Sequence, residues 1–352
     1  MFHRTGARIL AGVLTIAIAG VGLPGTASST VGTRTLATWT PIKGIALDVS
    51  DASKFTDAQT IAKAKEVFAW VVSLHANAVS LNFPFYESGR TSITPEASSI
   101  TPSPGRLAAI TAVAHDYNLS VEWRPYLSEK NFRDFARTSI QPWNTRLWFT
   151  NYWVFLKPYL EAAKMAGANS FSIAMETTSL LGYLDYWAPL VRQAKQVFGT
   201  QVFYSSSHVP YGTVPLTHFG YDAYQSIKEK SDAEATVGNF TVGFEKNFKV
   251  ARFSTTPQDT TIEELGIPAV SGAYDVPNQY WFPPGTRIVR FVQANWFAGA
   301  CNAFKHYRMA GIYFWSVNLE WFTPTENGSA NPGAWVGTST QSVVSKCFAT
   351  MP

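Results

Sequence analysis

The sequence has few of the residues that build metal centres, redox sites and nucleic-acid surfaces. It contains two Cys and six His in 352 residues, and these do not fall at the spacing of a zinc site. Charged residues make up 15% of the chain, and the formal net charge of +4 is spread along it without a block of Lys and Arg. We therefore expect no metal, no cofactor and no nucleic-acid partner.

Two catalytic motifs are also missing. No Gly-rich loop follows the first apolar segment of the expected domain, which removes the main signature of a dinucleotide-binding fold. No Gly-x-Ser-x-Gly elbow is present, which disfavours a hydrolase with a Ser nucleophile. The shortage of His and Cys ligands likewise disfavours metal-assisted hydrolysis.

Apolar and aromatic residues are abundant instead. Hydrophobic residues make up 46% of the chain, and the aromatic residues are 12 Trp, 15 Tyr and 24 Phe. This composition can fill one large core and argues against disorder. Aromatic rings also serve as flat apolar platforms for sugars, although most of these rings can equally pack a core.

The N-terminal segment predicts export. Arg4 and Arg8 supply a positively charged region, and an apolar stretch follows from Ile9 to Leu23. Small residues come next, up to Ala27. This order is typical of a secretory signal peptide over residues 1–27. A retained membrane anchor is the alternative, but the stretch is short for a span. No later segment is apolar enough to cross a bilayer. We expect a protein that is secreted or held in the cell envelope.

An oxidising destination gives the two cysteines a role. Cys301 and Cys347 predict a disulfide between the last predicted helix and the C-terminal tail. After the signal peptide we expect an N-terminal extension over residues 28–42 and one domain over residues 43–352, with no second domain. We expect the protein to be a monomer.

Short apolar runs alternate with longer amphipathic stretches along this domain, which is the pattern of a parallel sheet with crossover helices. Eight such units favour a closed (β/α)8 barrel, the TIM barrel, over an open doubly wound sheet. The predicted strands are Gly44–Val49, Ala78–Phe83, Leu119–Arg124, Ser170–Met175, Gln201–Ser205, His218–Ala223, Thr261–Leu265 and Gly311–Ser316. The predicted helices are Asp57–Leu74, Gly105–Tyr117, Arg146–Ala166, Tyr186–Phe198, Ala233–Phe248 and Gly285–His306.

Carboxylates stand at the ends of two of these strands. Glu176 directly follows the apolar run of the fourth strand, and Glu263 and Glu264 lie on the seventh. The carboxyl ends of barrel strands form the rim that carries active sites. Successive strand residues face opposite ways, so we expect only one of Glu263 and Glu264 to face a cleft. The alternative is that these are solvated or salt-bridged strand ends.

The same segments resemble a known family. The run that ends in Glu176, followed by the helical stretch LVRQAKQVF, is similar to the retaining glycosidases of clan A and most similar to glycoside hydrolase family 113, whose known members are β-mannanases. Glu264, Leu265 and Gly266 resemble the nucleophile strand of that family. The last predicted strand, GIYFWSVNLEW, resembles the aromatic strand that floors the sugar subsite in these enzymes.

The resemblance implies a glycoside hydrolase that acts by double displacement, with Glu176 as acid/base and Glu264, in preference to Glu263, as nucleophile. The substrate would be a polysaccharide or oligosaccharide, either β-mannan-like or a cell-envelope glycan, cut internally. Met175 departs from the family, because most clan A enzymes have Asn before the acid/base, and this leaves the sugar open. The alternative is a secreted carbohydrate-binding barrel that has lost catalysis.

Further residues at predicted strand ends are candidates for substrate binding. Tyr224 resembles a position from which clan A barrels direct a Tyr hydroxyl to the nucleophile, and Asp222 beside it points either into the barrel or toward a helix. Arg124 is expected to bind a sugar hydroxyl, to pair with a catalytic carboxylate or to form a structural salt bridge. The remaining candidates are Asp48, Asn82, Ser206 and His208, with Trp143, Trp281, Trp315 and Trp321 as sugar platforms.

Overall fold

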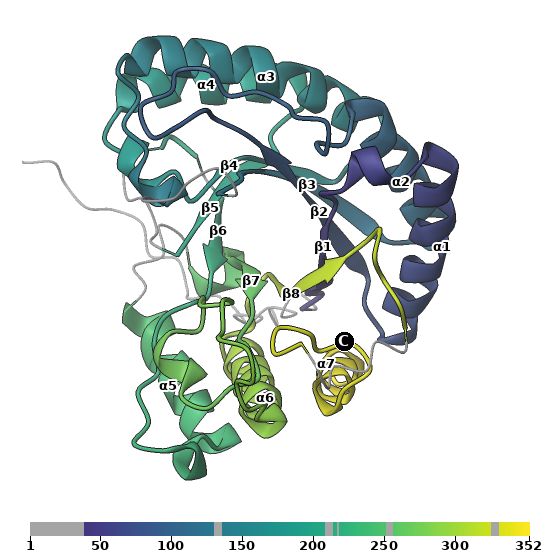
Figure 1. Ribbon diagram of the computed structural model, residues 1–352, viewed down its shortest axis with the longest axis vertical. Coiled ribbons are helices and arrows are strands. Elements are labelled where there is room, and N and C mark those ends of the chain that lie inside the picture. Colours follow the sequence, from purple (N-terminus) through teal and green to yellow (C-terminus); the bar gives the residue numbers. More distant parts are fainter. Residues whose placement is uncertain (1–38, 130–135, 208–213, 217, 251–255, 325–330) are drawn as a thin grey trace, which may run out of the picture. The chain divides into compact units, whose positions relative to one another are not determined.

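Eight parallel strands pair in chain order and close into a barrel, which confirms the predicted TIM barrel (Figure 1). The computed structural model describes residues 39–129, 136–207, 214–216, 218–250, 256–324 and 331–352. The predicted signal peptide over residues 1–27 lies outside the described residues. The strands are β1 (Ile42–Asp48), β2 (Ala78–Phe85), β3 (Ser120–Leu127), β4 (Ser170–Met175), β5 (Val202–Ser206), β6 (Phe219–Asp222), β7 (Thr261–Leu265) and β8 (Gly311–Asn318).

Helices surround the ring of strands, as Figure 1 shows. In the described residues they are α1 (Asp57–Ser73), α2 (Pro104–Asp116), α3 (Thr145–Met165), α4 (Leu184–Val197), α5 (Val237–Val250), α6 (Arg290–Tyr307) and α7 (Ser339–Ala349). The starts of α1, α2 and α3 follow ordinary capping rules, since the side chains of Thr56, Ser103 and Asn144 each accept a backbone N–H of the first turn.

Two helix predictions needed correction. The last predicted helix began at Gly285, but α6 begins at Arg290, because Gly285 has a φ of 82° that no right-handed helix can include. The expected C-terminal tail is instead the helix α7, whose Thr338 side chain accepts the N–H of Thr340 at 3.2 Å. Its polar first residues resemble a loop, so the apolar pattern alone did not reveal it.

The two faces of the barrel wall carry different side chains. On β1, Ile45 and Leu47 belong to the apolar core between strands and helices, while Ala46 packs with Tyr313 in a separate cluster inside the barrel. Gly44 pairs with Tyr313 across β1 and β8, and a Cβ there would collide with the tyrosine ring. The interior is thus filled by small and polar residues around a few large ones, which leaves room for charged groups near the rim.

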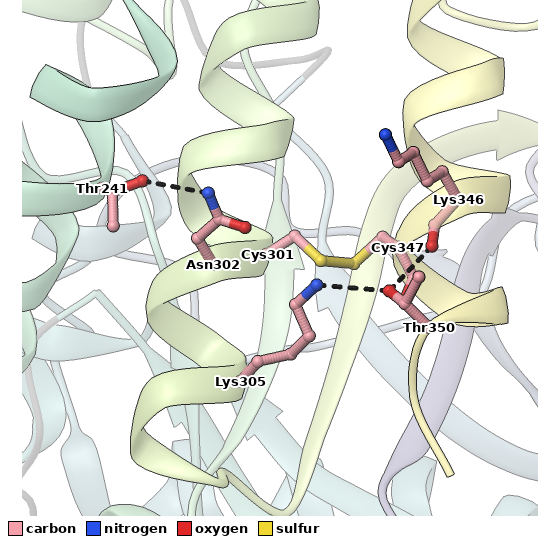
Figure 2. Close-up of a disulfide and its surroundings, with 7 residues drawn as sticks. All are labelled: Thr241, Cys301, Asn302, Lys305, Lys346, Cys347 and Thr350. Atoms are coloured by element: carbon pink, nitrogen blue, oxygen red, sulfur yellow. Dashed lines mark hydrogen bonds between the residues drawn. A yellow bond between two sulfur atoms is a disulfide. The ribbon is translucent and has the colours of Figure 1, made fainter.

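The predicted disulfide is confirmed. Figure 2 shows Cys301 on α6 bridged to Cys347 on α7, with Cα atoms 6.0 Å apart and a sequence separation of 46. Beside the bridge, Lys305 donates to the Thr350 hydroxyl at 3.2 Å. Closing a loop of this length contributes about 4 kcal/mol in the chain-entropy account of disulfides. The C-terminal helix is therefore fastened to the barrel.

Among the described residues, no helix combines the length and the apolar character needed to cross a membrane.

Candidate active site

An irregularity in β7 places both neighbouring glutamates inside the barrel. Ile262 pairs with Ile312 and Leu265 pairs with Phe314, and the register shifts between these two pairs. All four apolar side chains are buried in the core between strands and helices. Because two residues of β7 then oppose the single residue Tyr313, Glu263 and Glu264 both turn inward, as in a β-bulge. The sequence analysis expected one of them to face a cleft on the basis of regular alternation; the alternation is broken here, and the two carboxyl groups differ in depth instead.

Arg124 on β3 holds this cluster together. Its side chain is fully buried, and its Nη2 lies 3.2 Å from Glu264 Oε1 and 3.2 Å from Asp222 Oδ1. The same nitrogen donates to the Ser205 hydroxyl at 2.8 Å, and Nη1 donates to the Asn82 amide oxygen at 3.1 Å. Of the three roles expected for Arg124, its contacts fit the two that involve carboxylates, pairing with Glu264 and a structural salt bridge, and its side chain is not exposed to a sugar.

Glu263 lies deeper in the barrel than Glu264. A Cβ on Gly220 would collide with the Glu263 side chain, so that glycine makes the space the carboxyl group occupies. Glu263 hydrogen-bonds Glu122, and burial raises the pKa of both carboxyl groups. Two carboxyls that touch in a dry interior hold a proton between them. Glu263 therefore belongs to a buried pair beneath the rim.

Asp222 points into the barrel, which settles the two orientations that the sequence left open. It pairs with Glu264 across β6 and β7, and its side chain is fully buried. Burial raises its pKa well above the usual value, and the charge of Glu264 raises it further. Arg124 therefore lies between the side chains of Asp222 and Glu264 and contacts both.

Glu264 lies nearer the rim than Glu263. The pKa of Glu264 is raised to about 7 in total. Burial is the largest effect and raises this pKa, the Arg124 cation lowers it, and the charge of Glu176 raises it. A hydrogen bond with the Tyr224 hydroxyl also lowers the pKa of Glu264. Tyr224 thus lies where the sequence predicted, next to the strand-seven carboxylate. Glu176 and Glu264 are close enough for their charges to interact.

Glu176 is held by its backbone where β4 ends. Its φ of 51° lies in the left-handed region, which is uncommon outside glycine, and its N–H donates to the Ser205 carbonyl at 3.0 Å. Such strain is tolerated where the surrounding structure enforces it, and it is often found at functional sites. The strand therefore turns sharply at the residue that carries the carboxylate.

A second arginine, which the sequence analysis missed, lies at the same rim. Arg137 belongs to the short turn η2 (Arg137–Ser139), and its Nη1 approaches Met175 Sδ at 3.6 Å. Its Nε lies 3.3 Å from Glu129, and its guanidinium stacks 5.3 Å from the ring centre of Tyr126. The charge of Glu176 and then that of Glu129 raise its pKa. The cation that faces Glu176 therefore also contacts the unusual Met175.

Aromatic side chains line the rim of the barrel beside β8. Trp315, Tyr280 and Trp321 line a cavity of about 340 Å³. A Cβ on Gly266 would meet the Tyr280 hydroxyl and would lie 3.3 Å from Trp315 Cβ, so only glycine lets both rings approach the strand. Trp321 is 54% exposed and its indole donates to Asp51 at 2.6 Å. Trp315 and Trp321 thus line one cavity together with Tyr280, a ring that was not predicted, and their role as sugar platforms stays a prediction.

The other predicted residues divide into four groups: buried, at the rim, outside the described residues, and exposed away from the cavity. Asn82 is fully buried and donates to the Leu47 and Ser80 carbonyls, so it supports Arg124 and has no exposed amide for a substrate. Asp48 stays at the rim and accepts from the Tyr126 hydroxyl at 2.9 Å. Ser206 is buried at the end of β5. His208 lies outside the described residues, while Trp143 and Trp281 are 68% and 74% exposed and line none of the cavity beside Trp315.

The comparisons with known proteins agree with this geometry. A model of Glycoside Hydrolase Family 113 matches residues 59–333. The chain is therefore a glycoside hydrolase. It belongs to Glycoside Hydrolase Family 113. The comparison with curated proteins gives no match.

Solved structures share the fold at low sequence identity. A family 113 β-1,4-mannanase has a TM-score of 0.73 at 15% identity, with 89% of this chain and 99% of that chain covered. A family 113 β-mannanase from Alicyclobacillus acidocaldarius, in complex with ManMIm, has a TM-score of 0.70 at 17% identity, covering 88% and 98%. A family 5 enzyme from Streptomyces cattleya, in complex with GlcNAc, has a TM-score of 0.54 at 11% identity, covering 90% and 82%. Identities this low support the fold alone.

Proposed function

We propose that this glycoside hydrolase cleaves the backbone of a β-mannan-like polysaccharide with retention of configuration, with Glu264 as nucleophile and Glu176 as acid/base. The observation that carries the proposal is the pair of rim carboxylates with unlike surroundings. Glu264 is fixed against the buried Arg124 and hydrogen-bonded by Tyr224, whereas Glu176 projects from a strained turn at the end of β4. The titles of the similar structures name mannanases, and this supports mannan as the substrate.

In the proposed mechanism each group has a role in the two steps. Glu264 attacks the anomeric carbon while Glu176 gives its proton to the leaving oxygen, and a glycosyl-enzyme ester forms. Glu176 then takes a proton from water, which attacks the same carbon and releases Glu264. Arg124 and Tyr224 hold the Glu264 carboxylate in place during both steps. The rings of Trp315 and Tyr280 would bind the apolar face of the sugar.

Two further parts of the proposal rest mainly on the sequence. The N-terminal residues predict export, and the disulfide is consistent with an oxidising compartment. Internal cleavage is favoured because exposed aromatic residues are spread over several loops.

Replacing Glu176 by Ala tests the proposal most directly. We expect hydrolysis of mannan to fall by about 10²–10⁴-fold, because the leaving oxygen loses its proton donor. An aryl mannoside with an acidic phenol needs no proton to depart, so its glycosylation step should be nearly unchanged. The measurement is kcat/KM on both substrates, with Glu161→Ala on the exposed face of α3 as control. Equal losses on both substrates would mean that Glu176 is not the acid/base. An unsubstituted protein without activity would favour the carbohydrate-binding alternative.

The pH dependence follows from the raised pKa of Glu264. Only the carboxylate form can attack, so kcat/KM should rise as the pH increases through about 7, where Glu264 loses its proton. The Arg137 cation lowers that pKa. Arg137→Met should therefore move the rising limb to higher pH, while Arg192→Met on the exposed face of α4 should leave it in place. A limb that stays fixed in Arg137→Met would mean that this arginine does not act on the nucleophile.

A further inference from the structure

A groove runs between α3 and α4 on the outer side of the barrel. Two cavities of about 490 Å³ and about 260 Å³ form it, and they share Arg146 and Tyr186 as lining residues. The larger cavity lies at the starts of the two helices, and the smaller one reaches along α3 as far as Trp153. The stretch from Arg146 to Trp153 alone spans about 10 Å at the rise of an α-helix. The groove therefore has the length of a short oligosaccharide.

The groove is separate from the cluster around Glu264. The buried rings of Trp148 and Trp187, each fully covered, lie on the inner sides of α3 and α4 and belong to the core. The segments that form the groove nevertheless continue from the rim. Four residues after Glu176, the turn η3 (Thr178–Leu180) ends, and it leads into the lining residues that begin at Gly182.

Aromatic rings form the apolar part of the groove. Trp143 and Tyr183, at the end of the groove near the starts of α3 and α4, are 68% and 42% exposed. Large rings are usually covered in a folded domain. Tyr183 and Tyr186 lie with ring centres 6.2 Å apart, and Tyr186 in turn contacts Phe149 at 5.5 Å. With Trp153 further along α3, the rings are spread along the groove and do not form one patch.

Polar groups lie between these rings. Arg146 and Asp185 bring one charge of each sign, and the other polar lining residues are uncharged, including Asn144, Thr150 and Gln193. The groove thus suits a ligand without net charge that offers many hydroxyl groups and flat apolar faces. A neutral polysaccharide has this chemistry, since its ring faces stack on aromatic side chains and its hydroxyls exchange hydrogen bonds.

We propose that the groove between α3 and α4 is a second binding site for a neutral polysaccharide chain, separate from the catalytic rim. The site would hold the enzyme on an insoluble polymer while the rim cleaves another stretch of it. Linking two binding events on one polymer raises the effective concentration of substrate at the rim without a new contact there. This proposal rests on the proposed function, because it assumes that the polymer cleaved at the rim is also the ligand of the groove.

The test uses the full chain with two groove variants. Tyr183→Ala with Trp153→Ala removes two rings, and Thr150→Arg places a long cation on the exposed floor without removing any ring. Phe291→Ala, an exposed ring on α6, is the matched control. Retention on insoluble β-mannan is measured at 4 °C with Glu264→Gln added to every protein to prevent cleavage. Hydrolysis of a soluble aryl mannobioside is measured without that change.

We expect both groove variants to bind insoluble mannan about tenfold more weakly, which is the loss of about 1.4 kcal/mol. Their kcat/KM on the short substrate should stay within about twofold of the parent, and the control should match the parent in both assays. Equal retention of all proteins on mannan would overturn the proposal that the groove binds polysaccharide and would leave the proposed function intact. Absence of hydrolysis in the parent would overturn the proposed function first. Self-association that Thr150→Arg abolishes would show that the groove binds a second copy instead.

Discussion

Replacing Glu264 by Gln is expected to lower turnover of mannan and of aryl mannosides alike by at least about 10⁴-fold, the scale at which loss of a catalytic nucleophile is felt. The amide keeps the shape of the side chain and its place beside Arg124, but it cannot attack the anomeric carbon. The measurement is kcat on both substrates with purified protein, together with a thermal melt to show that the fold persists. The loss should not depend on the leaving group, in contrast to that of Glu176→Ala.

Glu263→Gln provides a matched control on the adjacent residue. Glu263 hydrogen-bonds Glu122 beneath the rim, and an amide can donate the hydrogen bond that the shared proton supplies. We expect this variant to keep activity within about tenfold of the parent, since Glu263 touches no reacting atom. A result in which Glu263→Gln is inactive and Glu264→Gln is active would exchange the two assignments. The products of the parent, followed by NMR, should first show the anomer with retained configuration.

Arg124→Met is expected to reduce the free energy of unfolding by about 3–5 kcal/mol at neutral pH, because it leaves buried carboxylates without their cation. The pKa values of Glu122, Asp222 and Glu263 are already raised by burial, and loss of the cation raises them further. The folded variant therefore binds more protons than the unfolded chain over a wider range of pH, so its stability should fall more steeply as the pH rises.

Urea unfolding at several pH values between 5 and 8 measures this effect. The difference in stability between parent and variant should be smallest at pH 5 and should grow toward pH 8. Arg106→Met is the control, because Arg106 also bonds three groups but pairs with the exposed Asp57 at 2.7 Å. Its cost should be about 1 kcal/mol and nearly independent of pH. A pH-independent loss in Arg124→Met would mean that packing, not charge, makes the arginine necessary.

The sequence was sufficient for the barrel and for part of its rim. Strand ends converge at one edge of a parallel barrel, so Glu176, Glu264, Tyr224 and Trp315 could be grouped from the sequence alone. Asn82 was grouped with them for the same reason, but its position in the layer below the rim depends on depth along the strand. Strand boundaries alone do not fix depth, because side-chain packing decides how far each inward residue reaches.

Other features had no signal in the sequence. The register shift in β7 depends on how two neighbouring strands pair, and the letters of the strand do not reveal it. Arg137 lies in a turn far from any strand end, so nothing indicated that it would fold back over Met175. Tyr280 likewise reaches the rim from a loop, although the small residue Gly266 marks the place where it arrives. Long connections between strands are the part of such a barrel that pattern analysis predicts least well.

The irregular pairing of β7 also limits how this enzyme could change. Because the backbone register sets the heights of Glu263 and Glu264, no choice of side-chain rotamer lets one take the place of the other. A lineage that lost Glu264 could not recruit its neighbour by a single substitution, even though a second carboxyl group is one residue away. Recovery would need a shift of the whole strand by an insertion or deletion, and that would turn Ile262 or Leu265 out of the core. The position of the proposed nucleophile is thus fixed by the pairing of the strand, which makes it resistant to gradual drift and vulnerable to complete loss.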